Sequence, residues 1–202
     1  MAEPIEDFPL GDPNKHSERA VRKASLVSLL KNNDVLSSEI SIPHTTSGVT
    51  LHNTDGIEPN VFVGRSGPTL EVNLASAYGD SLKGELLTVV LQTTLPGIDD
   101  KKEVFEEIFA FPFYPNNSDN TAMNVRFPLS ENLSETKVLL PRRKVPPELF
   151  VEKSWDSVVR ASRRNMIGTP GLRDGWREFS KKYADSKLAK PLLSTVKDIM
   201  SA

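Results

Sequence analysis

Residues 141–183 read PRRKVPPELFVEKSWDSVVRASRRNMIGTPGLRDGWREFSKKY, and the rest of the chain is best interpreted outward from them. Two segments of this stretch repeat apolar residues at steps of three and four, which predicts two amphipathic helices joined at residues 168–171. The first helix is expected to begin at Pro147, because a first-turn residue needs no N–H donor. The apolar faces comprise Val151, Trp155, Val158, Val159, Ser162 and Met166 in the first helix and Leu172, Trp176, Phe179 and Tyr183 in the second. We expect both tryptophans to anchor the core.

Basic residues crowd the same region of the chain. Residues 141–202 hold 14 Lys and Arg against 7 Asp and Glu, whereas residues 1–140 hold 11 against 20. A basic end on an acidic body can meet an external anion or an acidic face of its own protein, and the sequence leaves both open. The candidate residues for binding an anion or a nucleic acid are Arg142, Arg143, Lys144, Arg160, Arg163, Arg164, Arg173, Arg177, Lys181 and Lys182.

The first 140 residues predict one helix followed by a β-rich body. A helix is expected from residues 12–13 to about residue 33, and alternating or continuous apolar runs then predict six to eight short strands. Residues 86–91 are expected to form a central strand, and residues 123–129 a strand for which Pro128 indicates either an edge position or the strand end. Residues 99–109 are interpreted as a short helix.

These elements predict an α+β fold. We expect an antiparallel β-sandwich or partly open barrel, with an N-terminal helix and two to three basic amphipathic helices at the C-terminus. The third of these helices would start near Pro191. The predicted organisation is a flexible segment at 1–11, the helix and β-rich body at 12–140, and the basic helical region at 141–202.

Composition removes several classes of chemistry. The chain has no cysteine, which excludes disulfides, thiolate metal ligands and cysteine nucleophiles. No apolar run approaches the roughly 20 residues that span a bilayer, and the acidic, proline-rich start lacks a secretion pattern. We therefore expect a cytoplasmic or nuclear protein without a cofactor or a recognisable small-molecule substrate.

Two groups of residues suggest enzymatic or metal chemistry. Gly79-Asp80-Ser81-Leu82 is similar to the signature of GDSL-type esterases, a resemblance that implies a nucleophilic Ser81. That family takes its base from a downstream histidine, whereas the histidines here all precede Ser81, so we interpret the segment as a turn before a strand. His44, His52 and Asp55 could form a small metal site on a hairpin, but their spacing matches no recognised ligand pattern.

The functional hypothesis that fits best is a non-enzymatic structural or assembly protein. Its β-rich body would bind a partner or self-associate, and its basic end would bind an anionic surface such as a membrane. In layout alone, this resembles viral matrix or coat-associated proteins. One alternative is nucleic-acid binding through the helical pair at 147–184, and another is an enzyme of unrecognised type.

Overall fold

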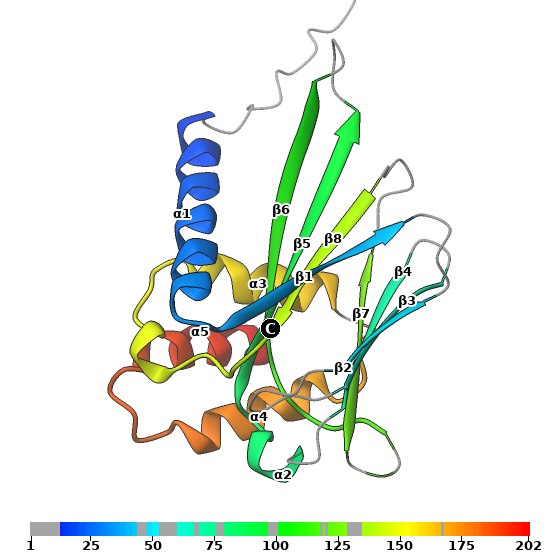
Figure 1. The fold of residues 1–202 in the computed structure, drawn as a ribbon. Coiled ribbons are helices and arrows are strands. Elements are labelled where there is room, and N and C mark those ends of the chain that lie inside the picture. The colour runs from blue at the N-terminus through cyan, green and yellow to red at the C-terminus, as the bar shows by residue number, and fades with distance from the viewer. Residues whose placement is uncertain are drawn as a thin grey trace, which may run out of the picture.

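The computed structural model describes residues 13–43, 48–52, 60–66, 69–75, 79–96, 101–117, 119, 121–128, 135–166 and 168–202. It has a mixed α+β fold with a helix at the N-terminal side and three helices at the C-terminal side, as the sequence predicts (Figure 1). The elements are α1 (Pro13–Asn32), β1 (Leu36–Pro43), β2 (Gly48–His52), β3 (Asn60–Ser66), β4 (Thr69–Ala75), α2 (Gly79–Leu82), β5 (Leu86–Pro96), β6 (Lys102–Pro112), β7 (Ala122–Pro128), β8 (Glu135–Pro141), the 3-10 turn η2 (Pro147–Leu149), α3 (Trp155–Asn165), α4 (Leu172–Lys182) and α5 (Lys190–Ser201).

The strands form two antiparallel sheets that do not close into a barrel. The inner sheet has the order β1-β8-β5-β6, and the outer sheet has the order β2-β3-β4-β7. Strand β5 lies between β8 and β6, and β7 lies at an edge and ends at Pro128, so both positional predictions are confirmed.

Burial shows that the inner sheet is the middle of three layers. Consecutive residues of β5 and β8 are buried, such as Val89 and Val90 or Val138 and Leu139, which requires cover on both faces. In β7 buried residues alternate with more exposed ones, as expected for a sheet covered on one face. Across the two sheets, the ring centroids of Phe109 and Phe127 lie 4.6 Å apart. Helices therefore cover one face of the inner sheet and the outer sheet covers the other (Figure 1).

The helical layer is built around both tryptophans. Trp155 and Trp176 are 1 % and 4 % exposed, which confirms their predicted place in the core. Helices α3 and α4 pack on β6, and α5 packs on both of them, so the apolar stripe that begins at Leu192 is used within the chain. The contact between α4 and β6 is close, because a Cβ added at Gly175 would lie 2.8 Å from Pro112 Cγ.

The prediction of a helix at residues 99–109 is wrong, because residues 102–112 form strand β6. The strand pairs with β5 along its whole length, from Leu86 opposite Pro112 to Pro96 opposite Lys102. Its inner half is buried on both faces, from Ile108 to Phe111, so no two-residue alternation marks it as a strand.

The first C-terminal helix starts later than predicted. Residues 147–149 form only a 3-10 turn, and α3 begins at Trp155. Between them the chain turns so that Phe150 packs against Phe179, while the Trp155 indole N–H donates to the Leu149 carbonyl at 2.7 Å. Val151 is consequently exposed instead of lying on the apolar face.

Candidate anion-binding site

The structure divides the ten candidate basic residues into two sets. Six of them form ion pairs with carboxylates of the same chain: Arg142, Lys144, Arg160, Arg177, Lys181 and Lys182. Within the residues that the structure describes, no acidic partner lies beside the other four: Arg143, Arg163, Arg164 and Arg173. The predicted anion-binding function therefore rests on the second set.

The strongest pairing in the first set surrounds one buried carboxylate. Glu85 is 3 % exposed, and its Oε1 lies 3.2 Å from Lys144 Nζ and 2.9 Å from Lys182 Nζ. The Tyr183 hydroxyl donates to Oε2 of the same carboxylate. These contacts connect the start of β5 to the segment after β8 and to the end of α4. Lys144 and Lys182 are therefore engaged in ion pairs within the chain.

The environment of Glu85 keeps it ionised. Burial by itself would raise the pKa of Glu85, but hydrogen bonds from Tyr183 and Lys182 and the charges of Lys182 and Lys144 outweigh it, so the pKa lies below its usual value. Burial, together with the hydrogen bond to Glu85, raises the pKa of Tyr183. Both pKa shifts favour an anionic Glu85 carboxylate beside a neutral Tyr183 phenol, a pairing that stabilises the fold.

The other ion pairs of the first set lie at the surface. Arg160 of α3 lies 3.7 Å from Asp156 and 3.6 Å from Asp198, and the second contact links α3 to α5. Arg177 and Lys181 each pair within α4 at 2.9 Å, with Asp174 and Glu178 respectively, and Arg142 lies 3.7 Å from Asp34 of the turn after α1. Exposed pairs of this kind contribute little to stability, yet they reduce the local excess of positive charge.

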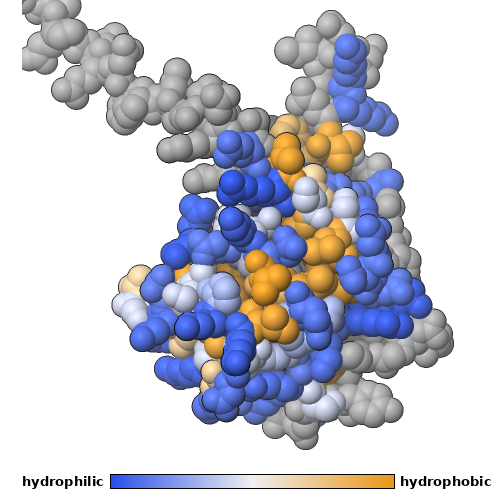
Figure 2. All heavy atoms as spheres, turned by 90° about the vertical axis from the view of Figure 1, so that its left-hand side faces the viewer, coloured by the Kyte–Doolittle hydropathy of each residue, from blue (hydrophilic) through white to orange (hydrophobic). Residues whose placement is uncertain are grey.

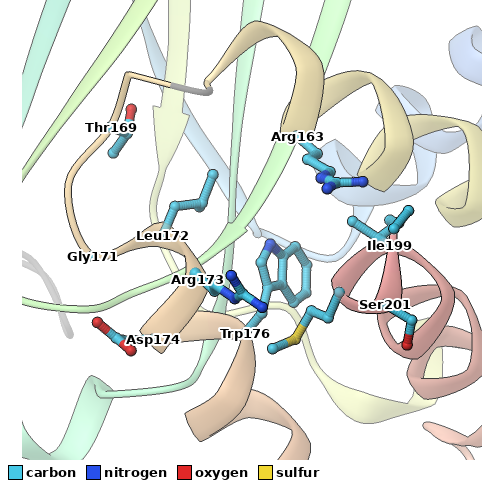
Figure 3. Close-up of a pocket in the computed structure, with 11 residues that line it drawn as sticks. Arg163, Thr169, Gly171, Leu172, Arg173, Asp174, Trp176, Ile199 and Ser201 are labelled. Atoms are coloured by element: carbon cyan, nitrogen blue, oxygen red, sulfur yellow. The ribbon is translucent and has the colours of Figure 1, made fainter.

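Two residues of the second set share the rim of a pocket. This pocket has a volume of about 510 Å³ and lies between the end of α3, the start of α4 and the end of α5 (Figure 3). Arg163 reaches it from α3 and Arg173 reaches it from α4, although they are separated by the loop that joins the helices. Leu172, Trp176, Ile199 and Met200 form the apolar part of its lining, here called the floor, while Thr169, Asp174 and Ser201 add polar groups.

The loop that brings these arginines together is held by hydrogen bonds to the β-rich body. Asn116 donates through Nδ2 to the Pro170 carbonyl at 3.0 Å, and the Arg126 backbone N–H donates to Thr169 Oγ1 at 3.4 Å. Helix α4 then begins at Leu172 without a side-chain cap, so its first N–H groups add a partial positive charge next to the pocket. Asp174 also lines the pocket, but its side chain points away from Arg173 and Trp176 (Figure 3) and pairs with Arg177, so neither rim arginine forms an ion pair in the described part of the chain.

The sequence identified the rim of this pocket but not its floor. Arg163 and Arg173 were candidate residues because of their charge, whereas Leu172 and Trp176 appeared only as members of an apolar face. That face meets the apolar side of α5 in space, and periodicity within one helix carries no information about a hollow between two helices. Arg143 and Arg164 are exposed elsewhere and do not line the pocket.

The other candidate sites do not assemble within the described residues. Gly79–Leu82 forms the short helix α2, and the Ser81 carbonyl accepts a hydrogen bond from Lys182 at 3.1 Å. His44 and Asp55, two members of the suggested metal site, lie outside the described residues, as does the segment 1–11. In the part of the chain that is described, no three His, Asp or Glu side chains are grouped so as to hold a metal ion.

Comparisons with known proteins give no family for this chain. No model of a protein family matches it, and no curated protein resembles it in sequence. Among the described helices, none combines the length and the apolar character that crossing a bilayer would require.

Proposed function

We propose that this chain is a non-enzymatic assembly protein whose helical layer binds an anionic membrane surface and whose β-rich body makes protein contacts. The observation that carries the proposal is the pocket with Arg163 and Arg173 on its rim and apolar residues on its floor. Two guanidinium groups without carboxylate partners in the described residues are suited to a phosphate, which they bind through paired N–H donors.

The apolar floor favours a lipid over a nucleic acid. A lipid headgroup joins its phosphate directly to glycerol and hydrocarbon, so one ligand would satisfy both the rim and the floor formed by Trp176, Ile199 and Met200. Helix pairs that enter a DNA groove usually pack on each other, whereas α3 and α4 each pack mainly on β6 and α5. Arg143 and Arg164 would add weaker, long-range attraction to the same negatively charged surface.

Vesicle binding tests the proposal. Vesicles of phosphatidylcholine with and without phosphatidylserine, random RNA and duplex DNA would be incubated with the protein at about 50 and 200 mM salt, and the bound fraction measured by sedimentation or gel shift. Binding to the anionic vesicles is expected, and it should weaken at the higher salt concentration.

A charge-matched control separates the pocket from net charge. The double variant Arg163→Gln/Arg173→Gln should reduce vesicle binding by about thirtyfold, because each of the two basic residues near such a surface contributes roughly 1 kcal/mol. Arg177→Gln/Lys181→Gln removes the same charge from ion-paired positions and should reduce it much less. Equal losses in both variants would contradict a specific role for the pocket, and binding to nucleic acid alone would favour the alternative function.

A further inference from the structure

The outer half of strand β6 has an open edge. In the inner sheet β6 pairs with β5 on one side, and among the described residues it has no strand on the other. Its inner half is covered, because α3 packs there and Ser162 Oγ accepts a hydrogen bond from the Ala110 backbone N–H at 2.9 Å. Towards the projecting end of the strand (Figure 1), the Val104 and Phe105 side chains are 59 % and 51 % exposed.

The hydrogen bond from Ala110 also fixes which backbone groups point outward. In an antiparallel pair, alternate residues direct their N–H and C=O groups to the partner strand, and the residues between them direct theirs away. Since the N–H of Ala110 points to α3 and not to β5, the even-numbered residues face away from β5. Val104 and Glu106 therefore present backbone donors and acceptors at the open edge.

The charges along this edge match those of a second copy that runs antiparallel to it. Lys101 and Lys102 stand at one end and Glu106 and Glu107 at the other, all four are exposed, and none forms an ion pair within the described residues. The two carboxylates accept neutral hydrogen bonds, Glu106 from Gln92 at 2.9 Å and Glu107 from Asn165 at 3.1 Å, so their negative charges are not balanced by these contacts. If a second copy pairs antiparallel with its Val104 opposite Val104, each Lys102 faces a Glu106 and each Lys101 faces a Glu107. Val104 then occupies a hydrogen-bonding position, as its outward backbone requires. A register centred one residue later would set Lys102 opposite Ile108 and would lose the attraction between Lys102 and Glu106.

We propose that two copies of this chain associate through β6, pairing residues 101–107 about a two-fold axis at Val104 so that their inner sheets become one continuous sheet. This deepens the proposed function, since it names the self-associating surface of the β-rich body. Figure 2 shows apolar surface running up one face of the molecule towards its projecting end, and Val104 and Phe105 are two of the large exposed apolar residues among those described. A contact of about seven residues per strand is small, so we expect a weak, concentration-dependent dimer that becomes populated when molecules gather on a surface.

Charge exchange tests the register. Sedimentation velocity over a range of concentrations would give the dimer Kd of the wild type and of Lys102→Glu, Glu106→Lys and the combined Lys102→Glu/Glu106→Lys variant. Each single change converts two attractive pairs into repulsive ones and should weaken the dimer about tenfold or more. The combined variant restores both pairs and should regain most of the affinity. The two single variants should also form a dimer when mixed, although neither does so well alone.

A control and a local readout complete the test. Lys153→Glu makes the same charge change as Lys102→Glu at an exposed position away from β6 and should leave the Kd unchanged. Hydrogen exchange at the Val104 and Glu106 amides should slow as the concentration of wild-type protein rises. The proposal would be overturned if the protein stayed monomeric at every accessible concentration. It would also be overturned if both single variants dimerised with the Kd of the wild type. Vesicle binding by a monomer would refute only this inference, and a dimer that binds no anionic surface would refute only the membrane function.

Discussion

At the scale of single residues, Glu85 is a position where one side chain joins three separate segments of the chain. Its carboxylate is buried and accepts contacts from Lys144, Lys182 and Tyr183. Its lowered pKa means that the ionised form is stabilised in the folded state more than in the unfolded chain. Ionised Glu85 therefore stabilises the fold at neutral pH, and this contribution is lost as the pH falls from the ordinary glutamate range through the lowered value.

The variant Glu85→Gln should lower the free energy of unfolding at pH 7 by about 1–3 kcal/mol, because two lysines lose their charged acceptor. The difference from the wild type should shrink in the acid range, where the wild-type carboxylate becomes protonated. Urea denaturation at a series of pH values measures both effects. Glu178→Gln removes an exposed carboxylate from α4 and should change little. A deficit for Glu85→Gln that persists unchanged to the lowest pH would show that the charge is not responsible.

The arginines of the pocket and the lysines around Glu85 could not be distinguished from sequence. Lys182 and Arg173 both appear as basic residues on an amphipathic helix, yet Lys182 contacts Glu85 near the start of β5 while Arg173 stands at a pocket. Which of them is occupied depends on contacts between residues far apart in the chain. Local pattern identifies charged candidates, and only tertiary structure decides which of them remain available.

At the scale of elements, the strands that lie at the surface of the layers were the most predictable. Strand β7 belongs to the one-sided outer sheet, and its alternation locates it to within one residue at each end. Strand β6 was mistaken for a helix because its inner half is covered by α3 and α4 on one face and by the outer sheet on the other. Double cover removes the period of two on which the prediction depended.

The packing of α4 on β6 gives a prediction for this element. Gly175→Ala should lower stability by about 1–3 kcal/mol, since the added methyl group would collide with Pro112 and the core must shift to admit it. At Gly168 an added Cβ meets no atom within 4 Å, so Gly168→Ala should be neutral or slightly stabilising. Thermal or urea unfolding compares the two, and an unchanged Gly175→Ala protein would mean that α4 is free to move away from the sheet.

At the scale of the whole molecule, the boundary expected near residue 141 does not separate the hydrophobic contacts. Buried residues of α1, both sheets and the three C-terminal helices belong to one continuous cluster. Both tryptophans lie in the helical layer, so their fluorescence reports on residues 141–202, whereas the far-ultraviolet circular dichroism also reports on the strands.

Because the core is continuous, the two signals should follow a single transition during urea unfolding, with the same midpoint and the same slope. Separate fluorescence and circular dichroism transitions would show instead that the helical layer unfolds by itself. The same experiment on Trp155→Phe, which leaves only Trp176 next to the pocket, would then locate the region that opens first.

The closeness of α4 to its neighbours has a consequence for the ancestry of this chain. Gly84 has a φ of +81°, and a Cβ there would lie 3.0 Å from the backbone of Glu178 in α4. Gly175 lies in the same helix, and a Cβ there would lie 2.8 Å from Pro112 of β6. At both places a side chain would force its neighbours to move, and at Gly84 it would also be strained by the positive φ. Homologues that have diverged at nearly every other position should therefore still carry glycine at both. One glycine precedes the hairpin of β5 and β6 and the other lies in α4, so the pair offers a sequence signature by which distant homologues could be recognised.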